Sequence, residues 1–222
     1  MRSHYVKNSP QILAASEYVE QEPFANRGKW RESLGIAPEA PLCLEIGCGK
    51  GRFLEEMARL EPEAGWTGLE RISSVLCRAA QRMDALAEDQ APHHLRLIRA
   101  EALQLGEIFA DGEISRIYLN FSDPWPKVKH CKRRLTSDRF LPIYRRIMTP
   151  DGCLQLKTDS DDLFAFSLQS LAEDGWRIGV REDDLQASPY AGDNIMTEYE
   201  IFFTAQGKPI HLLRAFPPVS CP

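Results

Sequence analysis

The residues best suited to chemistry gather in one segment, Asn120-Phe121-Ser122-Asp123-Pro124-Trp125-Pro126-Lys127, and in the basic run that follows it. Because proline fixes its own φ and restricts the preceding residue, we expect Asp123 and Trp125 to be held in extended conformations. A rigid acid beside dense positive charge suits an enzyme that holds a base while it binds a nucleic-acid backbone. A solvated charged turn is the alternative, but the two prolines and the tryptophan favour the functional interpretation.

A second group of candidates surrounds a glycine-rich turn. Glu45 lies in an apolar run at 42–46, and Gly47, Gly49 and Gly51 follow it. Glycine has no Cβ, so a ligand can approach the backbone of such a turn closely. The G-x-G-x-G spacing differs from the G-x-G-x-x-G of dinucleotide-binding folds and favours an adenosyl amino acid over a pyrophosphate. Taken alone, the triplet also fits a tight turn that binds nothing.

Two further acids follow the next apolar runs. Glu70 follows Thr67-Gly68-Leu69, and Glu101 follows Leu97-Ile98-Arg99-Ala100. At this distance from the glycine turn, Glu70 is well placed to accept hydrogen bonds from both hydroxyls of a ribose. Glu101 is placed to reach an adenine amino group. Either acid could instead only begin a helix, where acids are favoured. Together the turn and the acids match the order expected of a class I S-adenosylmethionine fold.

Strands alternate with helices around these candidates. We expect strands at 42–46, 66–69, 95–100, 114–121 and 153–156, last strands at 176–180 and 199–204, and helices at 53–60, 72–86, 140–148 and 163–172. This alternation predicts an α/β fold, a mostly parallel seven-stranded sheet with helices on both faces. Ligands of such sheets bind outside the carboxyl ends of the strands, where the acids lie. Residues 1–39 are expected as an N-terminal extension, 40–215 as the main domain and 216–222 as a loose tail.

Composition limits the classes of protein to consider. A chain of 222 residues with 43% hydrophobic residues suits one α/β domain. It contains no apolar run of membrane-spanning length, no signal-peptide pattern and no cysteine spacing typical of zinc sites, which together favour the cytoplasm and no metal. The net charge of −5 argues against general affinity for nucleic acid. A polyanion must therefore meet a local patch, and residues 127–139 are the densest basic stretch.

Five segments together resemble the bacterial tRNA (guanine-N7)-methyltransferase family: LEIGCGKG (44–51), GLE (68–70), NFSDPWPKVKHCKRRLT (120–136), LKTD (156–159) and TEYE (197–200). They run in the family's order and cover roughly residues 40–205. The DPWPK…KRR segment is highly specific, whereas many methyltransferases share the glycine turn. The resemblance implies a class I methyltransferase fold with S-adenosylmethionine as methyl donor. It also implies tRNA as partner and 7-methylguanosine, at position 46 in the variable loop, as product.

The resemblance also implies roles for individual positions. Residues around the cofactor would be Glu45, Gly47, Gly49, Gly51, Glu70, Glu101 and Asp123. Residues that contact the substrate would be Lys127, Asp159, Thr197, Glu198, Tyr199 and Glu200. RNA-binding residues would be Lys129, His130, Cys131, Lys132, Arg133 and Arg134, which we call the basic strip. Glu101 stands where the family usually has aspartate, and Val128 and Cys131 interrupt the basic residues.

The chemistry of guanine N7 agrees with this set. N7 carries an in-plane lone pair at neutral pH, so its methylation needs no histidine base, cysteine nucleophile or metal. It does need N7 aligned with the methyl group, and negative charge to stabilise the base as it becomes cationic. Asp123 is the best candidate for that charge, and its carboxylate could also accept hydrogen bonds from guanine. Asp159 has a similar claim, although Asp159-Ser160-Asp161-Asp162 also fits a helix N-cap.

Three other functions remain open from the sequence. An amino-group methyltransferase of the same fold could use a similar D-P loop, and its product would be an N6- or N4-methylated base. A non-catalytic RNA-binding protein could retain the fold without binding cofactor. A nicotinamide oxidoreductase is disfavoured by the glycine spacing. The sequence does not decide between a monomer and a homodimer.

Overall fold

The computed structural model describes residues 6–218, which form two compact units that divide between Ala110 and Asp111. Residues 219–222 of the predicted tail lie outside the described part of the chain. Each unit contributes four strands, so residues 6–218 hold eight strands where the sequence predicts seven. The additional strand is the two-residue β1 (Val19–Glu20), which is too short to give a recognisable alternation.

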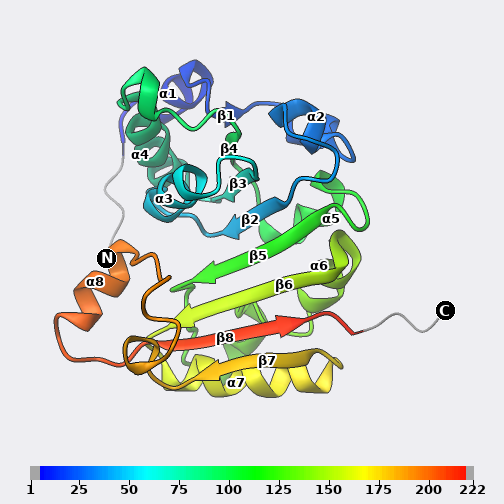
Figure 1. Cartoon of the computed structure of the whole chain (residues 1–222), viewed down its shortest axis with the longest axis vertical. Helices are drawn as coiled ribbons and strands as arrows, with labels where there is room; N and C mark the ends of the chain where they lie inside the picture. Colours follow the sequence, from blue (N-terminus) through cyan, green and yellow to red (C-terminus); the bar gives the residue numbers. More distant parts are fainter. Residues whose placement is uncertain (1–5, 219–222) are drawn as a thin grey trace. The chain divides into compact units, whose positions relative to one another are not determined.

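The strands of the first unit run parallel, in the order β1-β4-β3-β2 (Figure 1). In addition to β1, they are β2 (Leu42–Ile46), β3 (Gly65–Leu69) and β4 (Leu95–Ile98). Every residue of β2 and β3 is buried, which is typical of parallel strands covered on both faces. The register pairs Ile46 with Leu69 and Leu69 with Ile98. The carboxyl ends of β2, β3 and β4 therefore meet at one edge.

The helices of the first unit begin at Ser9, within the segment that the sequence predicts as an N-terminal extension. They are α1 (Ser9–Ala15), α2 (Trp30–Leu34), α3 (Arg52–Leu60), α4 (Ser73–Asp84) and α5 (Leu105–Ile108), with 3₁₀ turns at Pro23–Asn26, Glu88–Gln90 and Ala102–Gln104. Trp30 is fully buried, its Nε1 donates to the Ile108 carbonyl at 2.9 Å, and its ring lies 5.3 Å from that of Phe109. The segment expected as an extension thus supplies a large side chain to this core.

The second unit has the strand order β5-β6-β8-β7 (Figure 1). Its strands are β5 (Ile114–Asn120), β6 (Met148–Thr158), β7 (Arg177–Glu182) and β8 (His211–Phe216). β5 and β6 are parallel, while β8 is antiparallel to both β6 and β7. The helices are α6 (Leu141–Ile147), α7 (Asp161–Glu173) and α8 (Glu198–Thr204), with 3₁₀ turns at Val128–Arg133 and Leu185–Ala187.

The prediction of a strand at 199–204 is wrong, because these residues belong to α8. The last strand is β8, in a stretch to which the sequence assigns no element. Aromatic and β-branched residues favour a strand at 199–204, but Thr197 caps the helix by accepting a hydrogen bond from the Glu200 amide at 3.1 Å. Glu198 and Glu200 add acids to the first turn, which the helix dipole favours. Within residues 6–218, no helix combines the length and the apolar character needed to cross a membrane.

Candidate functional site

The glycine turn has the backbone that its sequence predicts. Gly47, Gly49 and Gly51 all have left-handed φ angles, of 80°, 59° and 79°. The Gly47 and Cys48 amides donate to the Leu69 carbonyl at 2.7 and 3.1 Å, which fixes the turn at the end of β3. A Cβ built on Gly47 would meet no atom within 4 Å. Open space therefore lies beside this backbone, and a ligand can approach it.

Two buried carboxylates lie next to this turn. Glu45 is 3% exposed and Glu70 is 9% exposed. The Ile72 amide donates to Glu70 Oε1 at 2.9 Å, yet burial raises the pKa of Glu70 above its ordinary value. Burial also raises the pKa of the Cys48 thiol well above its usual range, and the charges of Glu45 and Glu70 add to that effect. The turn thus lies in a field of negative charge, which suits a cationic ligand.

Glu101 follows β4 at the same edge but has a local partner. It caps the 3₁₀ turn at Ala102–Gln104 in a capping box, in which its own amide donates to Gln104 Oε1 at 3.0 Å. This is the helix-start role that the sequence leaves open. The Glu101 carboxylate is exposed, so its contact with an adenine stays a prediction.

The residues of the first unit fit S-adenosylmethionine on these observations. The turn leaves space beside Gly47, as a bound adenosyl amino acid requires. The carboxylates of Glu45 and Glu70 match its positive sulfonium and ammonium groups. Glu70, the buried acid directly after β3, is placed to bind the hydroxyls of its ribose.

In the second unit, the Asp123 loop has an unusual backbone. Phe121, whose amide donates to the Lys157 carbonyl at 2.8 Å, has a φ of 51°. Trp125 has a φ of 42°, so the extended conformation predicted for it is wrong. Left-handed backbone at residues other than glycine is unfavourable by about 1–3 kcal/mol. Surrounding contacts must therefore hold the loop in this shape, with the Asp123 carboxylate exposed.

Arg134 supplies such contacts. It is 8% exposed, and its Nε and Nη2 donate to the carbonyls of Pro124 and Trp125 at 2.9 and 3.3 Å. Its guanidinium lies 4.6 Å from the ring centre of Phe166. The sequence groups Arg134 with the RNA-binding residues, but the structure turns it inward. Its guanidinium therefore binds groups of the protein itself, the loop carbonyls and the Phe166 ring.

The other residues of the basic strip are more accessible. Lys129, Lys132 and Arg133 are exposed, and Lys127 just before them is exposed as well. Arg133 lies 4.9 Å over the Trp125 ring. The two half-buried members are His130, whose ring meets the edge of Trp125, and Cys131. Trp125 thus packs against two residues of the basic strip, Arg133 and His130.

Asp159 follows the last residue of β6. The N-cap of α7 is Ser160, whose hydroxyl accepts from the Leu163 amide at 3.3 Å, so Asp159 does not fill that role. Lys208 Nζ lies 3.3 Å from the Asp159 carboxylate, and this lysine is half exposed. A contact between Asp159 and a substrate would therefore compete with a surface ion pair, which is weak.

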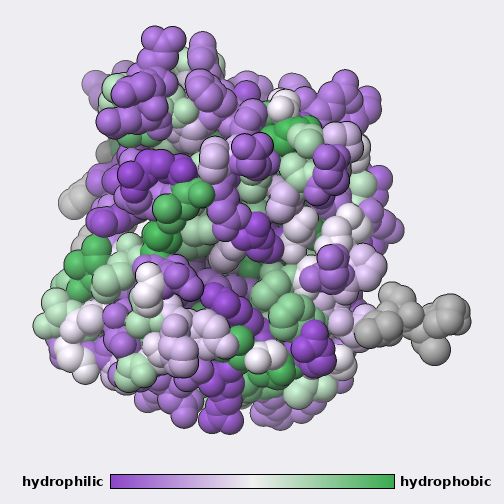
Figure 2. Space-filling model, viewed as in Figure 1, coloured by the Kyte–Doolittle hydropathy of each residue, from purple (hydrophilic) through white to green (hydrophobic). Residues whose placement is uncertain are grey.

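The predicted substrate residues at 197–200 have separate environments. Glu200 is fully buried and pairs with Lys157, whereas Glu198 is half-buried at the first turn of α8. Tyr199 is 50% exposed, and its ring stacks with that of Phe121 at 6.3 Å. Figure 2 shows hydrophobic surface over α8, where Ile201 and Phe202 are exposed too. Tyr199 is thus the aromatic member of this group, and it is half exposed.

Sequence reasoning missed Lys157 as an individual residue. Its ammonium is 1% exposed and donates to Glu200 Oε2, to Asn194 Oδ1 and to the Ile195 carbonyl, at 2.7, 2.9 and 2.7 Å. This network joins β6 to α8 and to the residues before it. A lysine that ends the apolar run of a buried strand could have signalled such a partner, because buried lysines are rarely unpaired.

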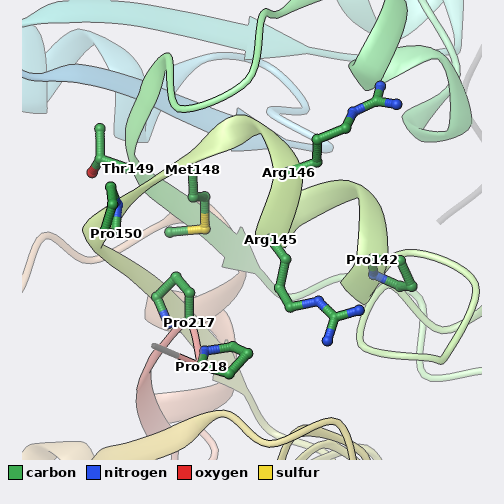
Figure 3. Close-up of a pocket in the computed structure, with 8 residues that line it drawn as sticks. All are labelled: Pro142, Arg145, Arg146, Met148, Thr149, Pro150, Pro217 and Pro218. Atoms are coloured by element: carbon green, nitrogen blue, oxygen red, sulfur yellow. The ribbon is translucent and has the colours of Figure 1, made fainter. Parts of the chain in front are cut away.

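A hollow of about 450 Å³ lies elsewhere in the second unit (Figure 3). Its lining includes Arg145 and Arg146 at the end of α6, Met148 at the start of β6, and Pro217 after β8. Met148 begins β6 and Asp159 follows its end, so the hollow and Asp159 are at opposite ends of this strand. No predicted site residue lines it.

The parallel strands, the glycine turn and the acids after successive strands define a class I S-adenosylmethionine-dependent methyltransferase. Solved structures share this fold. The 16S rRNA methyltransferase KamB matches with a TM-score of 0.63 and 14% identity, over 84% of this chain and 92% of that one. The antibiotic-resistance methyltransferase Kmr matches with a TM-score of 0.60 and 18% identity, over 86% and 92%.

Sequence comparisons identify the family. The profile of a family described as "Putative methyltransferase" matches residues 39–213. A tRNA (guanine-N(7)-)-methyltransferase of Lachnoclostridium phytofermentans is 43% identical over 97% of this chain and 98% of the relative. One of Geobacillus thermodenitrificans is 45% identical over 96% and 97%. The chain belongs to the tRNA (guanine-N7)-methyltransferase family.

Proposed function

We propose that the protein transfers a methyl group from S-adenosylmethionine to N7 of a guanine in tRNA, forming 7-methylguanosine. The observation that carries this proposal is the 43–45% identity, over nearly the whole chain, to relatives named for that reaction. The target is position 46 in the variable loop, by resemblance to the family. Since tRNA is the substrate, the proposed location is the cytoplasm.

The first unit binds the cofactor in this proposal. S-adenosylmethionine supplies an electrophilic methyl group on a sulfonium. Glu70 accepts hydrogen bonds from the ribose hydroxyls, and the negative field of Glu45 and Glu70 attracts the cationic part of the molecule. The backbone of Gly47 and Gly49 borders the space that the ligand fills. Glu101 holds the adenine amino group through its exposed carboxylate.

Asp123 is the catalytic residue in this proposal. Guanine N7 attacks with its own lone pair, so no group has to remove a proton first. Positive charge then develops on the base, and the Asp123 carboxylate stabilises it. The constrained loop supports this role, because a stabilising charge is effective only when it is already in position. Asp159 and Tyr199 complete the base contacts, with Tyr199 stacking on a splayed nucleotide.

The RNA backbone is bound by the exposed residues of the basic strip, Lys129, Lys132 and Arg133, with Lys127 nearer the base. Their side chains face solvent, and phosphate binding by such residues is electrostatic and largely independent of sequence. A net charge of −5 argues against a general attraction between the surface and a polyanion. Affinity for tRNA should therefore depend strongly on these few residues.

Unmodified total tRNA incubated with methyl-labelled S-adenosylmethionine tests the function. We expect label in 7-methylguanosine after digestion to nucleosides. Label in N6- or N4-methylated nucleosides would replace the proposal with an amino-group methyltransferase of the same fold. Binding of tRNA with neither label transfer nor cofactor binding would identify an RNA-binding protein instead. An Asp123→Asn protein serves as the matched control for background methylation.

A further inference from the structure

Two adjacent arginines of the basic strip have opposite surroundings. Arg133 is exposed, with its guanidinium over one face of Trp125. Arg134 is 8% exposed, and its donors serve the neighbouring carbonyls of Pro124 and Trp125. A phosphate of the RNA backbone cannot reach donors that are buried and already occupied. The two residues therefore have different functions, although they are identical in type.

The contact with two successive carbonyls requires an arginine. Its planar guanidinium presents several N–H groups in a fixed fork, whereas a lysine offers a single point charge on a flexible stem. Trp125 has a φ of 42° and precedes a proline, so its backbone does not favour this conformation by itself. The Arg134 fork binds the carbonyls on both sides of that strained position, and so holds the loop in shape.

Arg134 also joins the loop to α7. The ring of Phe166, on α7, lies 4.6 Å from the guanidinium carbon. Two residues after Arg134, the Thr136 hydroxyl lies 2.7 Å from that of Ser167, and both are buried. The first residue of α7 is Asp161, only two positions after Asp159. The segment that begins at Arg134 thus connects the loop bearing Asp123 to the helix that follows Asp159.

We propose that Arg134 is a positioning residue, which sets the conformation of the Asp123–Pro126 loop for methyl transfer. This inference rests on the proposed function, because it assigns to Arg134 an effect on the step that Asp123 assists. Replacement of Arg134 should slow the methylation of bound tRNA and leave tRNA affinity nearly unchanged. Replacement of Arg133 by glutamine should weaken tRNA affinity and flatten its salt dependence.

The test compares Arg134→Lys with Arg181→Lys, an exposed arginine on β7, outside the basic stretch at 127–139. Single-turnover methylation at saturating tRNA should fall about 10- to 100-fold in Arg134→Lys, the scale of a small misplacement of catalytic groups. In Arg181→Lys the rate should be that of the wild type. The salt dependence of tRNA binding should match the wild type in both variants. A normal rate with weaker binding in Arg134→Lys would make Arg134 an RNA contact and overturn the inference.

Two measurements complete the test. Trypsin should cut after Lys127 and Lys129 several-fold faster in Arg134→Lys than in Arg181→Lys, because the loop opens more often in the first variant. This comparison needs no substrate, so it tests the clamp even if wild-type protein methylates no tRNA. Phe166→Leu removes the ring beside the guanidinium without changing charge, and should also lower the rate. This variant carries the test if Arg134→Lys folds poorly. Unchanged cleavage and an unchanged methylation rate in both Arg134→Lys and Phe166→Leu would refute the inference.

Discussion

Lys157 Nζ lies 2.7 Å from Glu200 Oε2, and their side chains are only 1% and 0% exposed. Gln186 Nε2 donates to the other carboxylate oxygen of Glu200 at 3.1 Å, while Asn194 and the Ile195 carbonyl bind Lys157. Two opposite charges are therefore held out of water by a complete set of partners. Glu200, predicted as a substrate contact, anchors α8 from inside, and Tyr199 beside it faces solvent.

This pair gives a prediction about stability. Lys157→Met should lower the free energy of unfolding by about 3–5 kcal/mol, because it leaves the Glu200 charge buried without its partner. The double variant Lys157→Met/Glu200→Met should recover much of that loss, since hydrophobic replacements of a buried ion pair are often well tolerated. Urea unfolding of both variants measures the difference. A double variant that loses as much stability as Lys157→Met, or more, would contradict the prediction that the unpaired Glu200 charge causes the loss.

Cofactor binding gives a second prediction. Glu70→Ala should weaken S-adenosylmethionine binding by roughly 1.5–3 kcal/mol, the range for hydrogen bonds to a charged group. Affinity for tRNA should hardly change. Calorimetric titration of the folded variant measures the effect, with Glu63→Ala, an exposed acid between α3 and β3, as the matched control. An unaltered affinity for S-adenosylmethionine would remove Glu70 from the cofactor site.

The raised pKa of Glu70 predicts a pH dependence. Ribose hydroxyls donate to the ionised carboxylate, so a protonated Glu70 must lose its proton when the cofactor binds. Affinity for S-adenosylmethionine should therefore increase as pH rises from about 4.5, the ordinary value, through the raised pKa, and then level off. Stability of the free protein should change in the opposite sense over the same window, because the folded state binds more protons than the unfolded state. Glu70→Gln should flatten both profiles.

Catalysis gives a fourth prediction. Asp123→Asn keeps the shape of the side chain but removes the charge that stabilises the methylated base. Single-turnover methylation should fall about 100-fold or more, the scale seen when one electrostatic stabiliser is lost. Binding of tRNA should survive, as measured by filter retention. A normal single-turnover rate would mean that Asp123 only shapes its loop.

RNA binding gives a fifth prediction, in which Arg134 is left intact. Changing Lys129, Lys132 and Arg133 to Gln should weaken tRNA binding and reduce the slope of log affinity against log salt by about 2–3, since fewer counterions are released. The methylation rate at saturating tRNA should be largely retained. If the salt slope of this triple variant equals that of the wild type, the RNA backbone lies on another surface.

The sequence predicts the first unit better than the second for a physical reason. Glu45, Glu70 and the glycines are local features at the ends of parallel strands, and the register of those strands brings them together. The left-handed φ angles of the glycine turn also follow directly from residue type. These features do not depend on distant contacts, so the local sequence is enough to predict them.

The second unit depends more on distant contacts. Residues 199–204 have the composition of a strand, and the cap at Thr197 decides for a helix. Arg133 and Arg134 are indistinguishable by type, and contacts with the Phe166 ring and with the carbonyls of the Asp123 loop separate the buried residue from the exposed one. The role of Lys157 likewise depends on Glu200, far along the chain. Local pattern cannot supply such information.

The interruption of the basic strip by Cys131 has a practical consequence. Cys43, Cys48 and Cys77 are buried, and burial raises the pKa of Cys153, whereas Cys131 is half-buried among residues proposed to bind RNA. Thiol reactivity depends on access and on the thiolate form. In a Cys221→Ser background, which removes the cysteine outside the described residues, a small thiol-reactive fluorophore should label Cys131 preferentially. Its emission would then report the arrival and departure of tRNA at the basic strip in real time.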